Sequence, residues 1–257
     1  MNLLAALFGL AVLGSLTTST LLHLEILEAS PGVLALIVTT HGLFGAFFFK
    51  GYMDYRTLHR LVGQGRGELF SYVIGVLAQR AWLPGFSDHY RMRHVQGALL
   101  AGLPSRALDA ADAFYGEVKG PRQADELDVL TGRVVANIEM GRRWWAEQSL
   151  ERARAHPGAE AHRGLEAATA RLAWLSGDAG AAAKVLAQLP SEPRWPFGPV
   201  VEARRQVWLA DALRDSGDAA GATEAYESAI QLAPESFWGE EARRCRSRLT
   251  GLVRGHV

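Results

Sequence analysis

The side chains that most often perform chemistry in proteins are sparse in this chain and poorly spaced. The closest pair of histidines, His89 and His94, lies five positions apart, whereas two metal ligands on one helical face lie four apart. Cys245 is the only cysteine, which excludes an intramolecular disulfide and a cysteine-rich zinc site. The sequence has no Gly-x-Ser-x-Gly motif and no paired-carboxylate motif. We therefore expect no enzymatic activity, no metal site and no cofactor.

One glycine-rich segment has the composition of a phosphate-binding loop. Residues 63–67 read Gly-Gln-Gly-Arg-Gly, but no predicted strand precedes them and no Lys-Ser/Thr pair follows them. Such a motif indicates phosphate binding only between a strand and a helix. The sequence favours a flexible joint at this point.

The positive charges are absent from one end of the chain. All 27 Lys and Arg residues lie at position 50 or later, and the first 49 residues hold only two charges, Glu25 and Glu28. Two long apolar runs, 3–22 and 33–49, fill this region, and a helix needs roughly 20 apolar residues to cross a bilayer core. Basic residues follow the second run, as they do on the cytoplasmic side of membrane proteins. We therefore expect a transmembrane helical hairpin over residues 1–50, with both termini cytoplasmic.

A cleaved secretory signal peptide is the alternative for the first apolar run. The run lacks a basic segment before it and a small-residue cleavage site after it, so the hairpin is favoured. In the second run, His41, Gly42 and Gly45 are expected to serve helix packing within the membrane or against another subunit. A functional role for His41 is the alternative, because ionisable side chains inside a bilayer are often functional.

Residues 51–86 are expected to form a juxtamembrane linker with an amphipathic helix. The stretch 69–83 is apolar over about 10 residues and then amphipathic, which is too short to span a bilayer. It suits the bilayer surface or the underside of the following domain. We favour packing against the cytoplasmic end of the hairpin.

A spacing of small and apolar residues repeats along residues 87–257. The clearest copy has Gly217, Ala222, Tyr226, Ala229 and Pro234, which is typical of two helices that approach closely at small residues, the second ending at proline. This copy resembles a tetratricopeptide repeat. Weaker copies are Gly177, Ala182, Leu186 and Leu189; Gly141, Ala146, Leu150 and Ala153; and Gly102, Ala107, Ala111 and Phe114.

The resemblance implies an all-α fold for the region after the linker. We expect a tetratricopeptide-like α-solenoid of about four helix pairs over residues 87–257, following the transmembrane hairpin. The stretch 235–253 has Phe237, Trp238 and Ala242 on one face and is expected to be the capping helix, since terminal repeats need a polar outer face.

In this family the first helix of each pair lines a concave groove that holds a peptide or helix of a partner protein. The resemblance implies that the groove of this chain exposes eight side chains: Arg93, Gln96, Arg171, Trp174, Arg204, Val207, Asp211 and Arg214. An arginine-rich groove with an aromatic platform suits an acidic or amphipathic segment. Carboxylate binding, as in the chaperone-binding members, is not expected, because Ala167 and Asp211 occupy places where that ligand set is needed.

Aromatic residues outside the repeat positions are further candidates for partner contact. Trp195 and Phe197 lie in the proline-rich stretch 190–199, where they either contact a partner or tuck between the third and fourth repeats. Of the neighbours Trp144 and Trp145, one is expected to enter the core and the other to point outward.

Two functions are compatible with these features. The first is a membrane-tethered scaffold for protein–protein interaction at the cytoplasmic face, and the second is an accessory subunit of a larger membrane complex with the hairpin as main interface. The formal net charge of zero does not favour nucleic-acid binding. The Ala-, Arg- and Gly-rich composition suggests a bacterial source, so the expected location is a bacterial inner membrane.

Overall fold

The computed structural model describes most of the chain after the first apolar runs. The described residues are 57–80, 84–116, 123–191 and 197–254, together with Thr39 and Gly42. Every regular element in these residues is helical, which confirms the all-α prediction. Residues from Leu58 onward form one compact unit, which therefore begins well before the predicted boundary at position 87.

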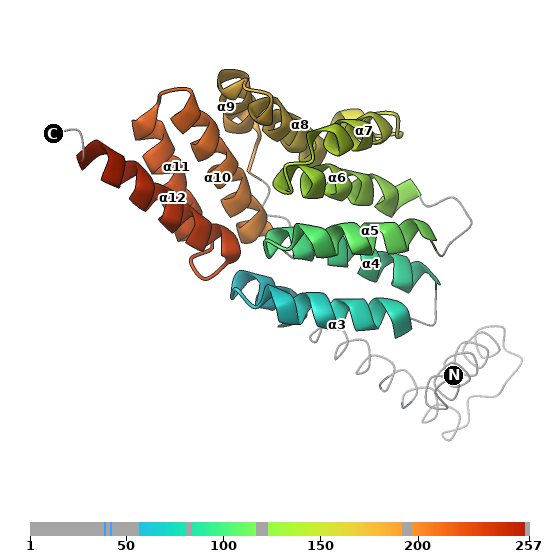
Figure 1. The fold of residues 1–257 in the computed structure, drawn as a ribbon. Coiled ribbons are helices and arrows are strands. Elements are labelled where there is room, and N and C mark those ends of the chain that lie inside the picture. The colour runs from blue at the N-terminus through green and yellow to red at the C-terminus, as the bar shows by residue number, and fades with distance from the viewer. Residues whose placement is uncertain are drawn as a thin grey trace, which may run out of the picture. The chain divides into compact units, whose positions relative to one another are not determined.

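Ten α-helices have defined bounds in the described residues, and residues 57–63 are also helical. The helices are α3 (Gly67–Arg80), α4 (Pro84–Leu100), α5 (Pro104–Gly116), α6 (Gln123–Glu139), α7 (Arg143–Arg154), α8 (Arg163–Leu175), α9 (Ala179–Gln188), α10 (Gly198–Asp215), α11 (Ala219–Leu232) and α12 (Phe237–Arg254), with a 3-10 turn at Ala159–Ala161. Successive helices pack as hairpins, α4 on α5, α6 on α7, α8 on α9 and α10 on α11 (Figure 1). The arrangement is solenoid-like.

The turn within each of these hairpins has the same backbone geometry. Gly102, Gly141, Gly177 and Gly217 have φ angles of 73°, 68°, 93° and 94°, in the left-handed region that glycine adopts without steric cost. The N–H of Gly217 donates to the Arg214 carbonyl at 3.1 Å, and the next N–H donates to the Leu213 carbonyl at 2.9 Å, as in a Schellman motif. The four glycines of the sequence repeat therefore mark the four helix–helix turns.

A fifth hairpin precedes the four that the sequence indicates. Gly65 has φ 69°, and the N–H groups of Gly65 and Arg66 donate to the carbonyls of Val62 and Leu61 in the same pattern. Residues 57–63 and α3 are thus a helix pair, and the prediction of a flexible joint at residues 63–67 is wrong. α3 packs on α4 and buries Phe70 and Ile74 completely, so it belongs to the stacked helices.

The sequence pattern missed the first hairpin because the large and the small residue of the helix contact have exchanged places. The large side chain is on α3 and the small residue is on α4. Five residues after the turn glycine, the other hairpins have a buried alanine: Ala107, Ala146, Ala182 and Ala222. Here that position is Phe70, and the facing helix α4 has Gly97, where an added Cβ would overlap the Phe70 ring. The pattern requires a small residue on the second helix of each hairpin. In the first hairpin the small residue is instead on α4, the first helix of the next hairpin, so the pattern missed it.

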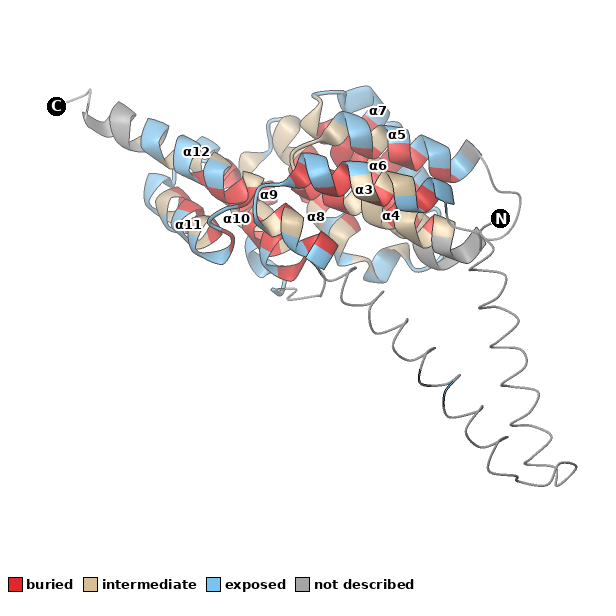
Figure 2. Ribbon diagram, turned by 90° about the horizontal axis from the view of Figure 1, so that it is seen from below, coloured by how far each residue is buried: buried red, intermediate tan, exposed pale blue. Residues whose placement is uncertain are grey.

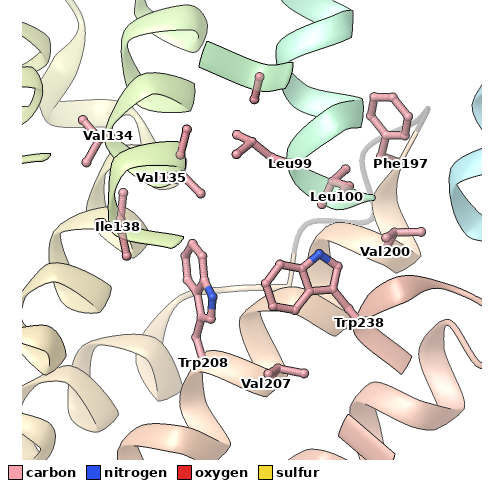
Figure 3. Close-up of a cluster of buried hydrophobic side chains, with 14 of the residues drawn as sticks. Leu99, Leu100, Val134, Val135, Ile138, Phe197, Val200, Val207, Trp208 and Trp238 are labelled. Carbon is pink, nitrogen blue, oxygen red and sulfur yellow. The ribbon is translucent and has the colours of Figure 1, made fainter. Parts of the chain in front are cut away.

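The last helices contact the first ones, which an open solenoid does not do. The Phe197 ring, just before α10, lies 4.7 Å from the His59 ring and 5.7 Å from the Phe70 ring, measured between centroids. α10 also contacts α4 in addition to α8, α9, α11 and α12. Figure 3 shows Phe197 and Val200 beside Leu100. These contacts join residues far apart in sequence into a single core.

Two tryptophans fill the space where α10 and α12 meet α4 and α6. Trp208 of α10 and Trp238 of α12 are 1% and 3% exposed, and their rings meet edge to face with centroids 6.4 Å apart. Figure 3 shows them facing Leu99, Leu100 and Ile138 from α4 and α6. Buried residues concentrate where neighbouring helices face each other (Figure 2).

The prediction of an integral membrane location is contradicted by the described helices. Among the residues that the structure describes, no helix has both the length and the apolar character needed to cross a bilayer. The longest, α10 and α12, have 18 residues each and carry several charged side chains. The apolar runs 3–22 and 33–49, on which the transmembrane hairpin was predicted, lie outside the described residues apart from Thr39 and Gly42.

We expect His94, at the contact between α3 and α4, to make stability depend on pH. The Ser71 hydroxyl lies 2.6 Å from Nε2 of His94, and burial, with a contribution from Arg106, lowers the pKa of His94 to about 4. The unfolded chain, where a histidine has its ordinary pKa, binds the proton more readily between pH 4 and 6.5. The free energy of unfolding should therefore fall as the pH is lowered through this window.

We expect His94→Gln to remove this part of the pH dependence. Between pH 6.5 and 4 the wild-type chain should lose on the order of 2 kcal/mol more stability than the variant. Urea unfolding followed by circular dichroism at several pH values measures the difference. Equal losses for both proteins would show that His94 ionises equally well in the folded and unfolded states.

Candidate functional site

The eight residues predicted to line a groove lie on three first helices of the hairpins. Arg93 and Gln96 are on α4; Arg171 and Trp174 are on α8; Arg204, Val207, Asp211 and Arg214 are on α10. Arg171, Val207 and Asp211 are buried, whereas the other five are half-buried. The structure therefore differs from the prediction that all eight are exposed, since three belong to the interior between helices.

The two residues on α4 stand apart from the others. Nη1 of Arg93 donates to Oε1 of Gln96 at 2.8 Å, so the pair is joined within one helical turn. α6 lies between α4 and α8 in the stack, and α4 meets α10 only marginally. The residues on α8 and α10 form the candidate site by themselves.

Asp211 is the centre of a buried network that ties three helices together. Its carboxylate accepts from Nη1 of Arg171 on α8 at 2.9 Å and from the Tyr226 hydroxyl on α11 at 2.7 Å. Nη1 of Arg214 lies 3.4 Å from the same carboxylate. Burial and the Asp211 charge both raise the pKa of Tyr226. The network keeps its members engaged with one another, so Asp211 and Arg171 hold the site together.

Trp174 lies at the solvent edge of this network. The Arg171 guanidinium stacks on its ring 3.8 Å from the centroid, and its Nε1 donates to Asp215 at 2.9 Å. Asp215 also accepts from Nε of Arg214 at 2.7 Å, and that hydrogen bond is the main reason why the pKa of Asp215 is lowered. The ring is therefore held in one orientation with part of its surface exposed.

Arg204 differs from the other arginines of the site. Its guanidinium lies over the Trp208 ring, 4.8 Å from the centroid, and no carboxylate of the described residues forms an ion pair with it. Burial lowers the pKa of Arg204 to about 10, and the charge of Glu139 offsets this only in part. Desolvation without a paired carboxylate disfavours the charged form. An anionic group placed beside Arg204 would restore the lost stabilisation.

The sequence did not point to Glu139, which completes this part of the site. It is the last residue of α6, and its Oε1 accepts from Nε1 of Trp208 at 3.0 Å. Burial raises the pKa of Glu139, while the charges of Arg171 and Arg204 act in the opposite direction. A single glutamate at a helix end carries no periodic signal, and the partner is 69 positions away.

The remaining predicted residues do not join this site. Phe197 is 4% exposed and packs in the core against His59 and Phe70. It is therefore buried, as the second alternative expected, and is not a surface contact. Gly42 is helical and exposed, with open space around it. Trp195, His41 and Gly45 lie outside the described residues.

The two tryptophans at the start of α7 also differ from prediction. Trp144 and Trp145 are 59% and 57% exposed, so the expectation that one of them enters the core is wrong. The buried face of α7 consists instead of Ala146, Ser149, Leu150 and Ala153.

The fold and site define a class of protein: an all-α protein of stacked helical hairpins with an arginine–tryptophan cluster on α8 and α10. No protein-family model matches the chain, and no curated protein matches it.

Proposed function

We propose that this chain is a tetratricopeptide-like scaffold for protein–protein interaction, and that an acidic segment of a partner protein binds beside Arg204 on α10. The observation that carries the proposal is the state of Arg204: a half-buried residue whose desolvated guanidinium lies over the Trp208 ring, with no ion-pairing carboxylate among the described residues. A partner carboxylate would pair with it in a site that is already partly desolvated, where such pairs are strong.

The surroundings of Arg204 support a protein segment as the ligand. Trp174 offers a half-buried aromatic surface on α8, and Arg214 contributes a second half-buried guanidinium on α10. Tryptophan and arginine are the side chains most enriched where binding energy concentrates in protein interfaces. The repeated Schellman turns support the tetratricopeptide-like assignment, since they place a glycine at the same step of every hairpin. The proposal assigns no enzymatic activity to the chain.

Arg204→Gln tests the proposal because binding and stability should respond in opposite directions. The variant removes a desolvated charge that Glu139 compensates only in part, so the folded state should be as stable as the wild type or more stable. Affinity for the partner should fall by at least about tenfold. Affinity purification with the full chain, with co-eluting proteins identified by mass spectrometry and titrated individually, measures the second effect, and thermal melting measures the first.

Arg80→Gln is the matched control, because Arg80 is an exposed arginine at the end of α3, away from the site. The control should keep the partner. A partner retained at full affinity by Arg204→Gln, or released equally by both variants, would refute the proposed site. Loss of the partner together with loss of stability would indicate that Arg204 serves packing alone.

A further inference from the structure

A second surface with the properties of a binding site lies on α7, on the opposite side of its hairpin from the buried alanines. Trp144 and Trp145 meet edge to face, with ring centroids 4.6 Å apart and planes at 81°. Aromatic pairs prefer this arrangement, so the rings support each other although both are more than half exposed. Two large rings that already contact each other lose less conformational entropy on binding than two separate flexible side chains would.

A small cavity opens beside the two rings. Its volume is about 100 Å³, and it is lined by Leu130, Arg133, Trp144, Trp145, Gln148, Ser149 and Arg152. A cavity of similar scale, about 150 Å³, holds a benzene molecule in another protein, so this one has room for one apolar side chain. The Ser149 hydroxyl already donates to the Trp145 carbonyl at 2.8 Å. The main contact surfaces of the cavity are therefore the two rings and the guanidinium groups.

The charges around the cavity are unbalanced in favour of arginine. None of the lining residues is acidic, and residues 142–154 contain four arginines and two glutamates. Arg143 is paired with Glu147 at 2.8 Å, and Arg133 with Asp112 at 3.2 Å. Arg142 and Arg152 form no ion pair with a described residue, and Arg152 lines the cavity itself.

A third aromatic ring continues this surface onto α5. Tyr115 is 37% exposed, and the Arg133 guanidinium lies over its ring at 5.7 Å from the centroid. Arg133 thus borders the tryptophan cavity and stacks on Tyr115. The surface combines an apolar centre with a cationic rim, which is the usual composition of a high-affinity contact point.

We propose that Trp144, Trp145 and Arg152 form a docking site for an acidic segment of a partner protein that inserts one apolar side chain between the rings and the guanidinium. The charge of the rim identifies the occupant, because a neutral or basic segment would leave Arg142 and Arg152 unpaired or repelled. The site is on a second helix of its hairpin, whereas Arg204 is on a first helix. It stands independently of the function proposed above.

Selection from a random dodecapeptide phage library tests this proposal with the full chain as bait. Peptides recovered by the wild type and not by the Trp144→Ala/Trp145→Ala variant should be enriched in Asp and Glu next to an aromatic or aliphatic residue. Synthetic copies of these peptides should bind the double variant, and the Arg152→Glu variant, at least about tenfold more weakly in fluorescence anisotropy. Their affinity for Arg204→Gln should be unchanged, which separates this site from the other one.

Tyr72→Ala and Arg80→Glu are matched controls on α3, where both side chains are exposed. Neither should alter peptide binding. Because both tryptophans are exposed, the double variant should melt close to the wild type, and a large drop in melting temperature would show that they serve stability. Selection of basic or uncharged peptides would overturn the proposal. So would binding of single-stranded RNA that depends on the tryptophans, or a dimer in sedimentation that the double variant abolishes.

Discussion

Replacing Asp211 with alanine should lower the free energy of unfolding by about 3–5 kcal/mol, because it leaves the buried Arg171 guanidinium without its paired carboxylate. Asp211 accepts from Arg171 at 2.9 Å and from the Tyr226 hydroxyl at 2.7 Å, and the side chains of the ion pair are 9% and 10% exposed. Without the carboxylate, Arg171 keeps its stacking on Trp174 but loses the charge that compensates for its burial. Urea unfolding monitored by circular dichroism gives the change directly.

Asp112→Ala is the matched control for this prediction. Asp112 also pairs with an arginine of another helix, Arg133 at 3.2 Å, but its side chain is 64% exposed. An exposed pair of this kind contributes about 0–1 kcal/mol. The double variant Arg171→Leu/Asp211→Ala should regain part of the stability, since no buried charge is left unpaired. Equal effects of Asp211→Ala and Asp112→Ala would contradict the assignment of a buried network.

The second large effect concerns Phe70 and Gly97, the large and the small residue that have exchanged places at the contact between α3 and α4. Phe70→Ala should cost about 3–5 kcal/mol, because it removes a completely buried ring between α3 and α4. Gly97→Ala should cost about 2 kcal/mol or more, because its Cβ would overlap the ring and outweigh the better helix propensity of alanine. Each variant is assessed by its unfolding midpoint in urea.

The double variant Phe70→Ala/Gly97→Ala separates a specific fit from general damage to the core. In the double variant the added methyl group meets no ring and fills part of the cavity, so its cost should be smaller than the two single costs together by more than about 1 kcal/mol. Additive costs would mean that Phe70 and Gly97 do not share the contact. Phe114→Ala, at a fully buried ring on α5, is a control whose effect should add to that of Gly97→Ala.

The two largest predictions also limit how binding is tested. Asp211 and Arg171 were candidates for partner contact in the sequence, yet their burial means that substitutions there would weaken the whole domain. We expect that changes of Arg204 and of the pair Trp144–Trp145 cost little stability, so effects of these changes on binding can be interpreted. Variants at these positions can therefore distinguish a scaffold with one binding face from a scaffold with two.

The sequence by itself determined the turns and the small residues of four hairpins. A Schellman turn is made by hydrogen bonds between residues a few positions apart, as between Gly217 and Arg214, so its glycine requirement is visible locally. The close contact of paired helices needs small residues at a fixed distance from that glycine, and Ala107, Ala146, Ala182 and Ala222 meet this need. Both requirements act over less than one hairpin, which is why a spacing pattern expresses them.

Only the tertiary structure decided which charged and aromatic residues became partners and which stayed exposed. Arg171 meets Asp211 forty positions away, and Trp208 meets Glu139 across 69 positions, so neither contact has a local signature. The sequence indicated a loop position for Phe197, but the packing of α10 places its ring against Phe70. Trp144 and Trp145 are large aromatic residues, so their type alone would allow them to be core residues. Their exposure depends on what packs against α7, because burial depends on the neighbours that the whole fold supplies.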